Sequence, residues 1–254
     1  MGHKKLLACC GAVLAALSAS GTLADNHTST SWGGTELYAC MINDGKGMGD
    51  LMNVVDEWNT WSDERDIDNY YAWVLNPIYA WDADFERSAF WFGHAPSLAD
   101  MGEVAHTWLT QGSELNSKFN ETWTCNAHVE FASMIVRGGG GEASSGYASF
   151  RDRSFHEGKG VTDLMEATAQ YNAHQDANEV QSVTVYHLPG HGNPQDKTYD
   201  MKISQWVSDM AVYGANAEKY VNGGGWQAYG ETVGEVVSCD SPRMYSATLV
   251  RSGD

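Results

Sequence analysis

Basic side chains in the predicted strands of the second half of the chain are the first candidates for chemistry. Arg151, Arg153 and Lys202 lie in segments with strand-like patterning, and Arg243 lies in another. A cation on a buried strand face needs an anionic partner. The interpretation that we favour pairs these cations with Asp152, Asp200 and other acids, or places them facing water. The alternative places some of them in the space between two predicted sheets, where they would meet the anionic group of a ligand.

Three polar side chains at the ends of predicted strands form a second set of candidates. If the protein is an enzyme, Asn43, His94 and His156 are the first choices for acid–base or polarising roles, because they lie at strand ends or beside the mouth of a predicted cavity. The chain has no Gly-x-Ser-x-Gly nucleophile motif. Its two Gly-Lys-Gly turns lack the Lys-Ser/Thr pair of a phosphate-binding loop, so we interpret their first glycines as positions of positive φ with the lysines in solvent.

A loop with the sequence HLPGHGNPQD carries three side chains of metal-ligand type, His187, His191 and Asp196. Three such ligands on one short loop are compatible with a transition metal. The prolines and glycines between them are typical of an exposed hairpin turn. We therefore predict no metal site, and these three residues remain the alternative.

The elements that must position these candidates are written twice in the chain. DGKGMGDLMNVVDEWN, residues 44–59, and EGKGVTDLMEATAQYN, residues 157–172, share seven of sixteen positions. Later blocks follow in the same order, with YYAWVLNP matching SVTVYHLP and CNAHVEFASMIVR matching CDSPRMYSATLVR. The glycine-rich stretch GGGGEASSG separates the two copies. The sequence therefore contains an internal duplication.

Each copy predicts the order β-α-β-β-α-β, which is the ferredoxin-like unit. In the first copy we expect strands over 37–43, 70–77 and 88–93, helices over 48–61 and 97–109, and a last strand that ends at Arg137. Several of these strands are apolar on both faces, so helices cover one face and another layer must cover the other. We predict an α+β protein in which the two ferredoxin-like sheets pack face to face as an intrachain pseudo-dimer.

Duplication, element order and the two turns NDGKGMGDLM and HEGKGVTDLM resemble the dimeric α/β-barrel superfamily, which includes antibiotic-biosynthesis-monooxygenase-like and chlorite-dismutase-like proteins. The resemblance implies a pseudo-dimeric α/β barrel with a ligand space between its sheets. It also implies cofactor-independent oxygenation or isomerisation, or haem binding. Haem-degrading members use an Asn, a Trp and a helix-borne His, which here correspond to Asn43, Trp91 and His106. The duplicate positions hold His156, Trp206 and Tyr220.

The leading hypothesis is a protein that handles a small apolar or aromatic molecule between its sheets, as an enzyme or as a binding protein. Whether it is an enzyme stays open. We predict no cofactor, with haem or a metal as the alternatives. The predicted ligand-binding residues are aromatic or basic side chains of the strands: Trp73, Trp91, Arg151, Arg153, Tyr186, Lys202 and Trp206.

The beginning of the chain is typical of an export signal. Lys4 and Lys5 precede an apolar run and then small residues, which predicts a signal peptide over 1–24 and a periplasmic or secreted protein. We expect a flexible segment over 25–35, repeats over 36–137 and 147–254, and a linker over 138–146.

Charge and composition limit the partners. The formal charge of -18 becomes -20 when the two lysines of the signal are removed, and no acids are lost with them. Such a charge disfavours nucleic acid, and the mature chain has no further apolar run that predicts membrane insertion. With 43% hydrophobic residues the chain is not of disordered composition. We therefore expect a monomeric pseudo-dimer with a small-molecule ligand. In an oxidising compartment, two of Cys40, Cys125 and Cys239 could pair.

Overall fold

The computed structural model describes residues 31–81, 85, 89–138 and 141–253. The predicted signal peptide, residues 25–30 of the predicted N-terminal segment and residues 139–140 of the predicted linker lie outside these ranges. Strand β1 begins at Gly33, so the sheet includes three residues of the segment that was expected to be flexible.

Eight antiparallel strands close into a barrel in the order β1-β3-β2-β9-β5-β7-β6-β4, and β4 pairs with β1. Repeat 1 supplies β1 (Gly33–Ile42), β2 (Tyr71–Tyr79), β3 (Ala89–Ala95) and β4 (Trp123–Arg137). Repeat 2 supplies β5 (Gly146–Phe155), β6 (Val183–Pro189), β7 (Met201–Val207) and β9 (Arg243–Arg251), with β8 (Val237–Cys239) added beside β5. The predicted fold class is confirmed. The two sheets also join edge to edge, through β2–β9 and β4–β6.

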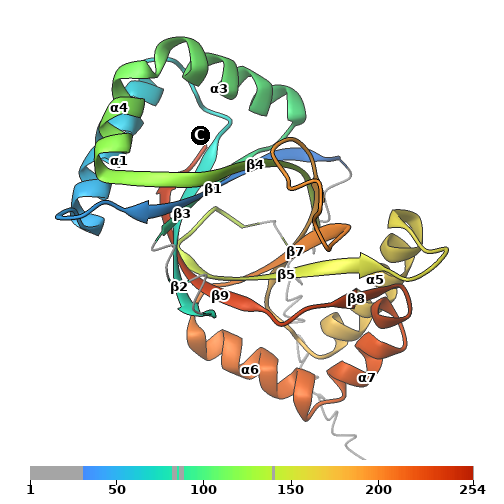
Figure 1. Cartoon of the computed structure of the whole chain (residues 1–254). Helices are drawn as coiled ribbons and strands as arrows, with labels where there is room; N and C mark the ends of the chain where they lie inside the picture. Colours follow the sequence, from blue (N-terminus) through green and yellow to red (C-terminus); the bar gives the residue numbers. More distant parts are fainter. Residues whose placement is uncertain (1–30, 82–84, 86–88, 139–140, 254) are drawn as a thin grey trace, which may run out of the picture.

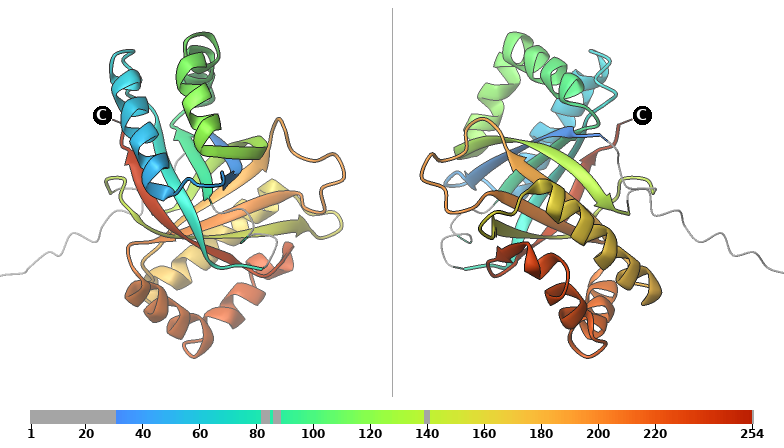
Figure 2. Two further views of the ribbon diagram at one scale, coloured as in Figure 1. Left: turned by 60° about the vertical axis from the view of Figure 1, so that its left-hand side comes forward. Right: turned by 90° about the vertical axis from the view of Figure 1, so that its right-hand side faces the viewer.

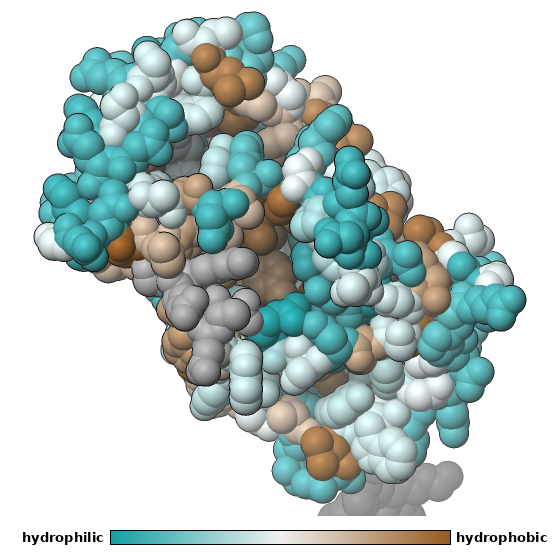
Figure 3. All heavy atoms as spheres, viewed as in Figure 1, coloured by the Kyte–Doolittle hydropathy of each residue, from teal (hydrophilic) through white to brown (hydrophobic). Residues whose placement is uncertain are grey.

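Helices cover the outer face of the barrel on two opposite sides (Figures 1 and 2). Repeat 1 supplies α1 (Met48–Asp63), α3 (Leu98–Gln111) and α4 (Ser113–Thr122). Repeat 2 supplies α5 (Val161–Ala177), α6 (Met210–Val221), α7 (Gly225–Gly230) and the 3₁₀ turn η1 (Val233–Glu235). The sequence pattern did not predict α4, α7 or β8. In the view of Figure 3 the surface is mainly hydrophilic, with small separate hydrophobic patches.

Aromatic side chains pack the inside of the barrel. Trp73 and Trp206, one from each repeat, have ring centroids 5.3 Å apart, and Phe92 lies 5.1 Å from Trp206. Phe150 and Tyr245 join the same cluster at 5.7 Å. The apolar second face of these strands is therefore buried by the other repeat, as the sequence indicated.

The repeated Gly-Lys-Gly motif builds the same helix entrance twice. Gly45 and Gly158 have φ of 77° and 75°, the left-handed region that glycine adopts without a steric cost. Two residues later in each copy, a glycine N–H donates to the side chain of Asp50 or Asp163, at 2.8 and 3.0 Å. These carboxylates also lie in the first turn of a helix, where the helix dipole favours them. The structural interpretation of the two turns is confirmed.

The last shared residue of the duplicated stretch ties the two repeats together. Asn59 Nδ2 donates to the Val250 carbonyl at 2.8 Å, and its equivalent Asn172 donates to the Val136 carbonyl at 2.7 Å. Each bond runs from the first helix of one repeat to the last strand of the other. It therefore holds the pseudo-dimer together in two symmetric places.

Two arginines repeat this symmetry at the ends of β4 and β9. Arg137 donates to Asp176 and, at 2.8 Å, to the Val180 carbonyl. Arg251 donates to Asp63 at 2.8 Å and to the Ile67 carbonyl. Both guanidinium groups are buried and carry hydrogen bonds to acids and carbonyls, as buried charges require.

A disulfide joins Cys40 of β1 to Cys125 of β4, and Cys239 is free and exposed. The two half-cystines face each other in the β1–β4 register. None of the helices in the described ranges combines the length and hydropathy of a membrane span.

Candidate functional site

A cavity of about 310 Å³ lies in repeat 2, between the outer face of its sheet and helices α5 and α6. This volume falls at the lower end of the range of small-molecule sites, about 300 to 1,000 Å³. Strands β5, β6 and β7 form its floor, and α7 and η1 contribute to one end. Tyr79, at the end of β2, reaches its rim from repeat 1. We call this space the repeat-2 cavity.

The repeat-2 cavity exists because large core residues of repeat 1 are replaced by small ones. Tyr70, 1% exposed, corresponds in the duplicated blocks to Ser182. Trp91 pairs with Tyr38 across the sheet, and Ile203 holds the same place opposite Arg151. A serine and an isoleucine therefore stand where repeat 1 has a tyrosine and a tryptophan.

In repeat 1 these aromatic residues fill the corresponding space. The Trp58 and Trp91 rings meet edge to face at 4.9 Å, and Trp91 Nε1 donates to the Tyr70 hydroxyl at 2.8 Å. That hydroxyl donates to Glu36 Oε1 at 2.5 Å. The ring of Phe119 on α4 packs against the same group, with its centroid 6.1 Å from that of Trp91. One copy of the duplicated unit is thus a packed core, and the other encloses space.

Two arginines of β5 line the repeat-2 cavity, and neither forms an ion pair with an acid among the described residues. Arg153 is only 3% exposed, and its Nε and Nη1 atoms have no hydrogen-bond partner among the described residues. The buried Nε of Arg151 is likewise unpartnered in the described part of the chain. The Arg153 guanidinium carbon lies 5.5 Å from the centre of the Tyr229 ring, a cation–π contact that does not satisfy its N–H groups.

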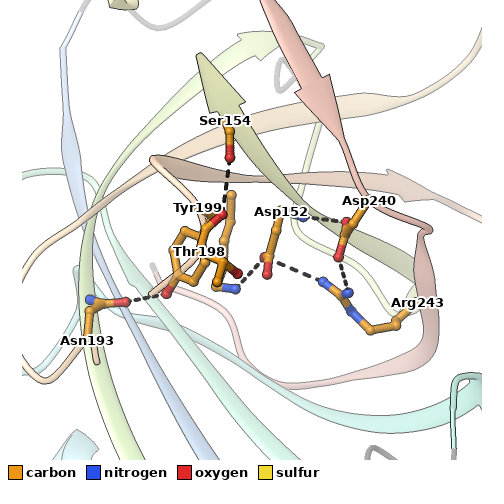
Figure 4. A network of polar contacts seen from close by, with 8 residues as sticks. Asp152, Ser154, Asn193, Thr198, Tyr199, Asp240 and Arg243 are labelled. Carbon is orange, nitrogen blue, oxygen red and sulfur yellow. Dashed lines mark hydrogen bonds and ion pairs between the residues drawn. The ribbon is translucent and has the colours of Figure 1, made fainter. Parts of the chain in front are cut away.

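The other two basic side chains of this sheet are paired with acids. Lys202 Nζ lies 2.5 Å from Asp152, and Arg243 lies 3.4 Å from the same carboxylate and 2.5 Å from Asp240. Figure 4 shows Asp152 and Asp240 beside Arg243 in this network. Asp200 instead accepts from the Phe155 N–H at 2.8 Å. The favoured pairing with acids is confirmed for Lys202 and Arg243. Arg151 and Arg153 line a cavity on the outer face of the repeat-2 sheet, and not the space between the sheets that the alternative named.

Neutral polar groups in the same cavity also lack partners. Eight buried side-chain nitrogen or oxygen atoms have no hydrogen-bond partner in the described part of the chain, and six of them belong to residues lining the repeat-2 cavity. Besides the arginine nitrogens, these are the hydroxyls of Ser182, Thr184 and Tyr229, and the Tyr229 hydroxyl also lies beside the thiol of Cys239. Buried polar groups are nearly always hydrogen-bonded in proteins, so their concentration here makes the repeat-2 cavity the candidate site.

Tyrosines form much of the wall. Burial raises the pKa of Tyr171 and of Tyr229 to about 12, and it also raises the pKa of Tyr186. These phenols are therefore neutral near pH 7 and can donate hydrogen bonds. None of the residues of α6 is buried; Tyr213 and Tyr220 on one face of this helix form the outer wall.

Three of the predicted ligand-binding residues, Arg151, Arg153 and Tyr186, line the repeat-2 cavity. Trp73 and Trp206 instead belong to the packed aromatic cluster inside the barrel. The structure thus fills the inter-sheet space at this cluster with rings, and the cavity lies on the other face of the repeat-2 sheet. Lys202 is held by Asp152, as described above, and Trp91 belongs to the core of repeat 1.

The predicted acid–base residues lie apart from one another. Asn43 binds the Asn120 carbonyl at 2.9 Å and Thr124 at 2.8 Å, beside α4. His94 Nδ1 lies 3.1 Å from Thr35 on β1, and burial lowers its pKa to about 4. His156 Nδ1 lies 3.2 Å from the Glu235 carbonyl on the exposed side of repeat 2. The structure does not bring them together, and a catalytic role for any of them stays a prediction.

The three alternative metal ligands are also separated. His187 lies inside the barrel with its ring nitrogens 2.7 Å from Ser133 Oγ and 2.8 Å from Ser204 Oγ. His191 is exposed and contacts Glu130 at 2.6 Å, and Asp196 lies in the exposed hairpin. Within the described ranges, His, Cys, Asp and Glu residues form no group of three that could hold a metal.

The haem ligands implied by the resemblance do not converge on one site either. Trp91 is packed in the repeat-1 core, and His106 is exposed on α3. In repeat 2, Tyr220 lines the cavity, Trp206 lies inside the barrel and His156 lies on its outside.

Sequence reasoning missed several lining residues, above all Ser182, Thr184, Tyr171, His174 and Tyr229. A signal for two of them was present, because the aligned blocks place Ser182 opposite Tyr70 and Tyr171 opposite Trp58. A loss of side-chain volume at positions that are core in the other copy points to a cavity. His174 and Tyr229 had no such signal.

No protein-family model and no curated protein sequence matches the chain. Solved structures do. A monooxygenase candidate from Lactobacillus acidophilus NCFM has a TM-score of 0.53 at 9% identity, covering 88% of this chain and 96% of that chain. A mutant chlorite dismutase from Candidatus Nitrospira defluvii has a TM-score of 0.51 at 8% identity, over 86% and 92%.

A heme-binding protein from Thermus thermophilus has a TM-score of 0.50 at 7% identity, covering 87% of this chain and 93% of that chain. At these identities the similarity concerns the fold. Together with the closed eight-stranded barrel and its symmetric ties, it establishes the architecture. The chain has the fold of the dimeric α/β-barrel superfamily, with both ferredoxin-like units in one polypeptide.

Proposed function

We propose that this protein binds a small anionic organic molecule in the repeat-2 cavity. The observation that carries the proposal is the pair of cavity-lining arginines, Arg151 and Arg153, which have buried N–H groups without a partner in the described part of the chain. A guanidinium stays protonated at any physiological pH, so neutralisation by proton loss is not available. A carboxylate, phosphate or enolate in the cavity supplies the missing acceptor.

The acidic composition of the whole chain makes the lack of an acidic partner for Arg153 among the described residues unusual. The chain carries 33 acidic residues against 15 basic ones. In such a protein any nearby acid could have paired with Arg153, as Asp152 does with Lys202. A buried cation without a partner destabilises the folded state, so we take its presence as support for a ligand role.

The wall of the cavity favours an aromatic body on the anion. Tyr171, Tyr213, Tyr220 and Tyr229 present rings to the space, and aromatic pairs contribute about 0.5 to 1.5 kcal/mol beyond the area that they bury. The sequence predicted an apolar or aromatic ligand between the two sheets, whereas the proposed site lies on the outer face of the repeat-2 sheet.

Chemistry on such a ligand would use the same groups. Arg151 and Arg153 are placed to stabilise negative charge that develops on an enolate, which is the charge that forms in cofactor-independent oxygenation and in isomerisation. His174 on the α5 wall is the imidazole that lines the cavity and is available for proton transfer. Binding is the proposed function, and turnover would be its extension.

Haem is the second candidate, favoured by one observation. His174 stands on the helix wall and Arg151 and Arg153 stand on the sheet, so an imidazole and two carboxylate partners are present. The donor set fits a haem, but the volume of about 310 Å³ suits a compact ligand better than a macrocycle. We therefore derive no step through haem.

We also propose that the protein is exported. The basic and apolar beginning of the chain supports this, and the Cys40–Cys125 disulfide is of the kind that persists in oxidising compartments. Mass spectrometry of the protein from the envelope tests it, because a mature chain that begins near Asp25 is expected.

Calorimetric titration with aromatic carboxylates tests the binding proposal. Wild-type protein is compared with Arg153→Met and with Arg243→Met, whose arginine belongs to the same sheet but is paired with acids. We expect Arg153→Met to lose about 10- to 100-fold in affinity, the value of one charge-assisted hydrogen bond. We expect Arg243→Met to bind as wild type does. Equal affinity of wild type and Arg153→Met contradicts the proposal.

A further inference from the structure

We infer that the ligand has two poles: an acid held by Arg151 and Arg153, and a neutral hydroxyl group at the far side of an aromatic ring, held by Ser182 and Thr184. This inference rests on the proposed function and adds the second pole. It assigns a recognition role to the hydroxyl side chains of Ser182 and Thr184, which lie close together at the start of β6.

The register of the sheet sets the two poles apart. Arg151 pairs with Ile203, and Ile203 with Tyr186, so these three residues form one row across β5, β7 and β6. Ser149, Gln205 and Thr184 form the next row on the same face. The direction from Arg153 through Arg151 therefore leads to the row of Thr184 and then toward Ser182.

The spacing of strands and residues in a sheet gives the distance between the backbones of Arg151 and Thr184. Arg151 and Thr184 are separated by two strand spacings, about 10 Å, and by two residues along the strand, about 7 Å. Their backbones are thus about 12 Å apart on the diagonal. An arginine side chain is long enough to cover part of that distance. A single substituted ring with a short acid arm matches the remaining span.

The far pole has the properties of a recognition site. Thr184 is 6% exposed, and its Oγ1 has no hydrogen-bond partner in the described part of the chain. The Ser182 hydroxyl is buried and unpartnered in the same way. Each hydroxyl can donate one hydrogen bond and accept others, so the pair suits a hydroxyl group and carries no charge to attract a second anion.

The opposite wall at this pole is fixed. Asn216 of α6 exchanges two hydrogen bonds with the backbone of Gln181, at 3.2 and 2.7 Å. Lys219 donates to the Glu179 carbonyl at 2.7 Å. These bonds hold α6 against the start of β6. Helix α6 therefore lies against the Ser182–Thr184 end of the cavity.

Paired aromatic acids test the inference. The probes are benzoate, phenylacetate and cinnamate, each compared with its 4-hydroxy form, so that three lengths of acid arm are covered. Binding is measured by calorimetry for wild type, Thr184→Val and Ser182→Ala. Thr184→Val keeps the shape of the side chain and removes only the hydroxyl, so the cavity stays intact.

For at least one pair we expect wild type to bind the hydroxylated acid about 5- to 100-fold tighter, the range for satisfying a buried polar group. Thr184→Val or Ser182→Ala should reduce that ratio toward one and leave the affinity for the parent acid unchanged. A ratio of one for every pair in wild type overturns the second pole and leaves the proposed function standing. If none of the six acids binds, the proposed function fails together with the inference.

Discussion

Arg153 and Cys40 occupy equivalent positions on the first strand of the two repeats, 113 residues apart. Cys40 is fully buried and bonded to Cys125, whereas Arg153 is almost as buried and has N–H groups in a cavity without a partner among the described residues. One duplicated position has thus become a covalent tie in one copy and a free cation in the other. On this divergence we base the proposal that repeat 1 has a structural role and that repeat 2 binds the ligand.

Replacing Arg153 should stabilise the folded protein, whereas most substitutions of buried residues destabilise it. Arg153→Met removes a buried charge without a partner in the described ranges, so we expect the free energy of unfolding to rise by about 1 to 3 kcal/mol. Arg251→Met removes a buried arginine bonded to Asp63 and the Ile67 carbonyl, and should lower it by about 2 to 4 kcal/mol. Urea denaturation of both variants measures this. Destabilisation by Arg153→Met would show that its guanidinium is satisfied in solution.

The repeats offer a direct exchange of side chains. Ser182→Tyr places in repeat 2 the residue that fills repeat 1, so it should abolish binding of aromatic acids without loss of stability. The reverse change, Tyr70→Ser, opens a space in the packed core and should cost about 3 to 5 kcal/mol. Calorimetry and denaturation together check the pair. If the Ser182→Tyr variant binds aromatic acids as tightly as wild type, the binding site is not the repeat-2 cavity.

Much of this architecture was predictable from the sequence, because the residues shared by the two copies are ones that the fold needs for its turns, helix caps and contacts between repeats. Gly45, Asp50 and Asn59 recur as Gly158, Asp163 and Asn172 since each makes a turn, a helix cap or a tie to the other repeat. Element order and doubly apolar strands then predicted the closed pair of sheets.

The location of the cavity could not be predicted in the same way. Alternation shows that a strand has two faces, but it does not show which face looks inward. Trp73 and Trp206 were therefore grouped with Arg151, although the barrel wall separates them. His174 and Tyr229 come from helices whose positions depend on tertiary packing, which no local pattern records.

Stability should fall in mild acid because two histidines are held neutral inside the barrel. Burial lowers the pKa of His187 to about 3 and that of His94 to about 4. The unfolded chain takes up these protons near pH 6.5, so stability is fully present above that pH and is lost as pH falls toward the folded pKa values. As pH falls from about 6.5 to 5, the loss for each histidine should approach about 1.4 kcal/mol per pH unit.

Denaturation at several pH values measures this slope. His187→Gln should halve it, and His191→Ala, which changes an exposed imidazole, should leave it unchanged. An unchanged slope in His187→Gln would show that other groups set the acid sensitivity.

The symmetric ties between repeats predict paired effects. Asn59→Ala and Asn172→Ala each remove one hydrogen bond to the other repeat, and each should cost about 1 to 2 kcal/mol. Asn53, exposed on the same helix as Asn59, is the matched control, and Asn53→Ala should stay within about 0.5 kcal/mol of wild type. Unequal effects of the two tie variants would argue against a symmetric interface.

The disulfide should contribute through the unfolded state. Cys40 and Cys125 close a loop with a sequence separation of 85, so the double replacement by alanine should lower the free energy of unfolding by about 2 to 5 kcal/mol. Thermal unfolding with and without reductant compares the two states. A reductant effect that persists in the double variant would point to Cys239 instead.

The most direct test of the central claim is a crystal structure of the protein grown with 4-hydroxycinnamate. We expect the acid in the repeat-2 cavity, its carboxylate on Arg151 and Arg153, its ring between the tyrosines of the wall and its hydroxyl on Thr184 or Ser182. The account is contradicted if the acid lies inside the barrel, or if the arginines are found paired with protein acids and the cavity is closed.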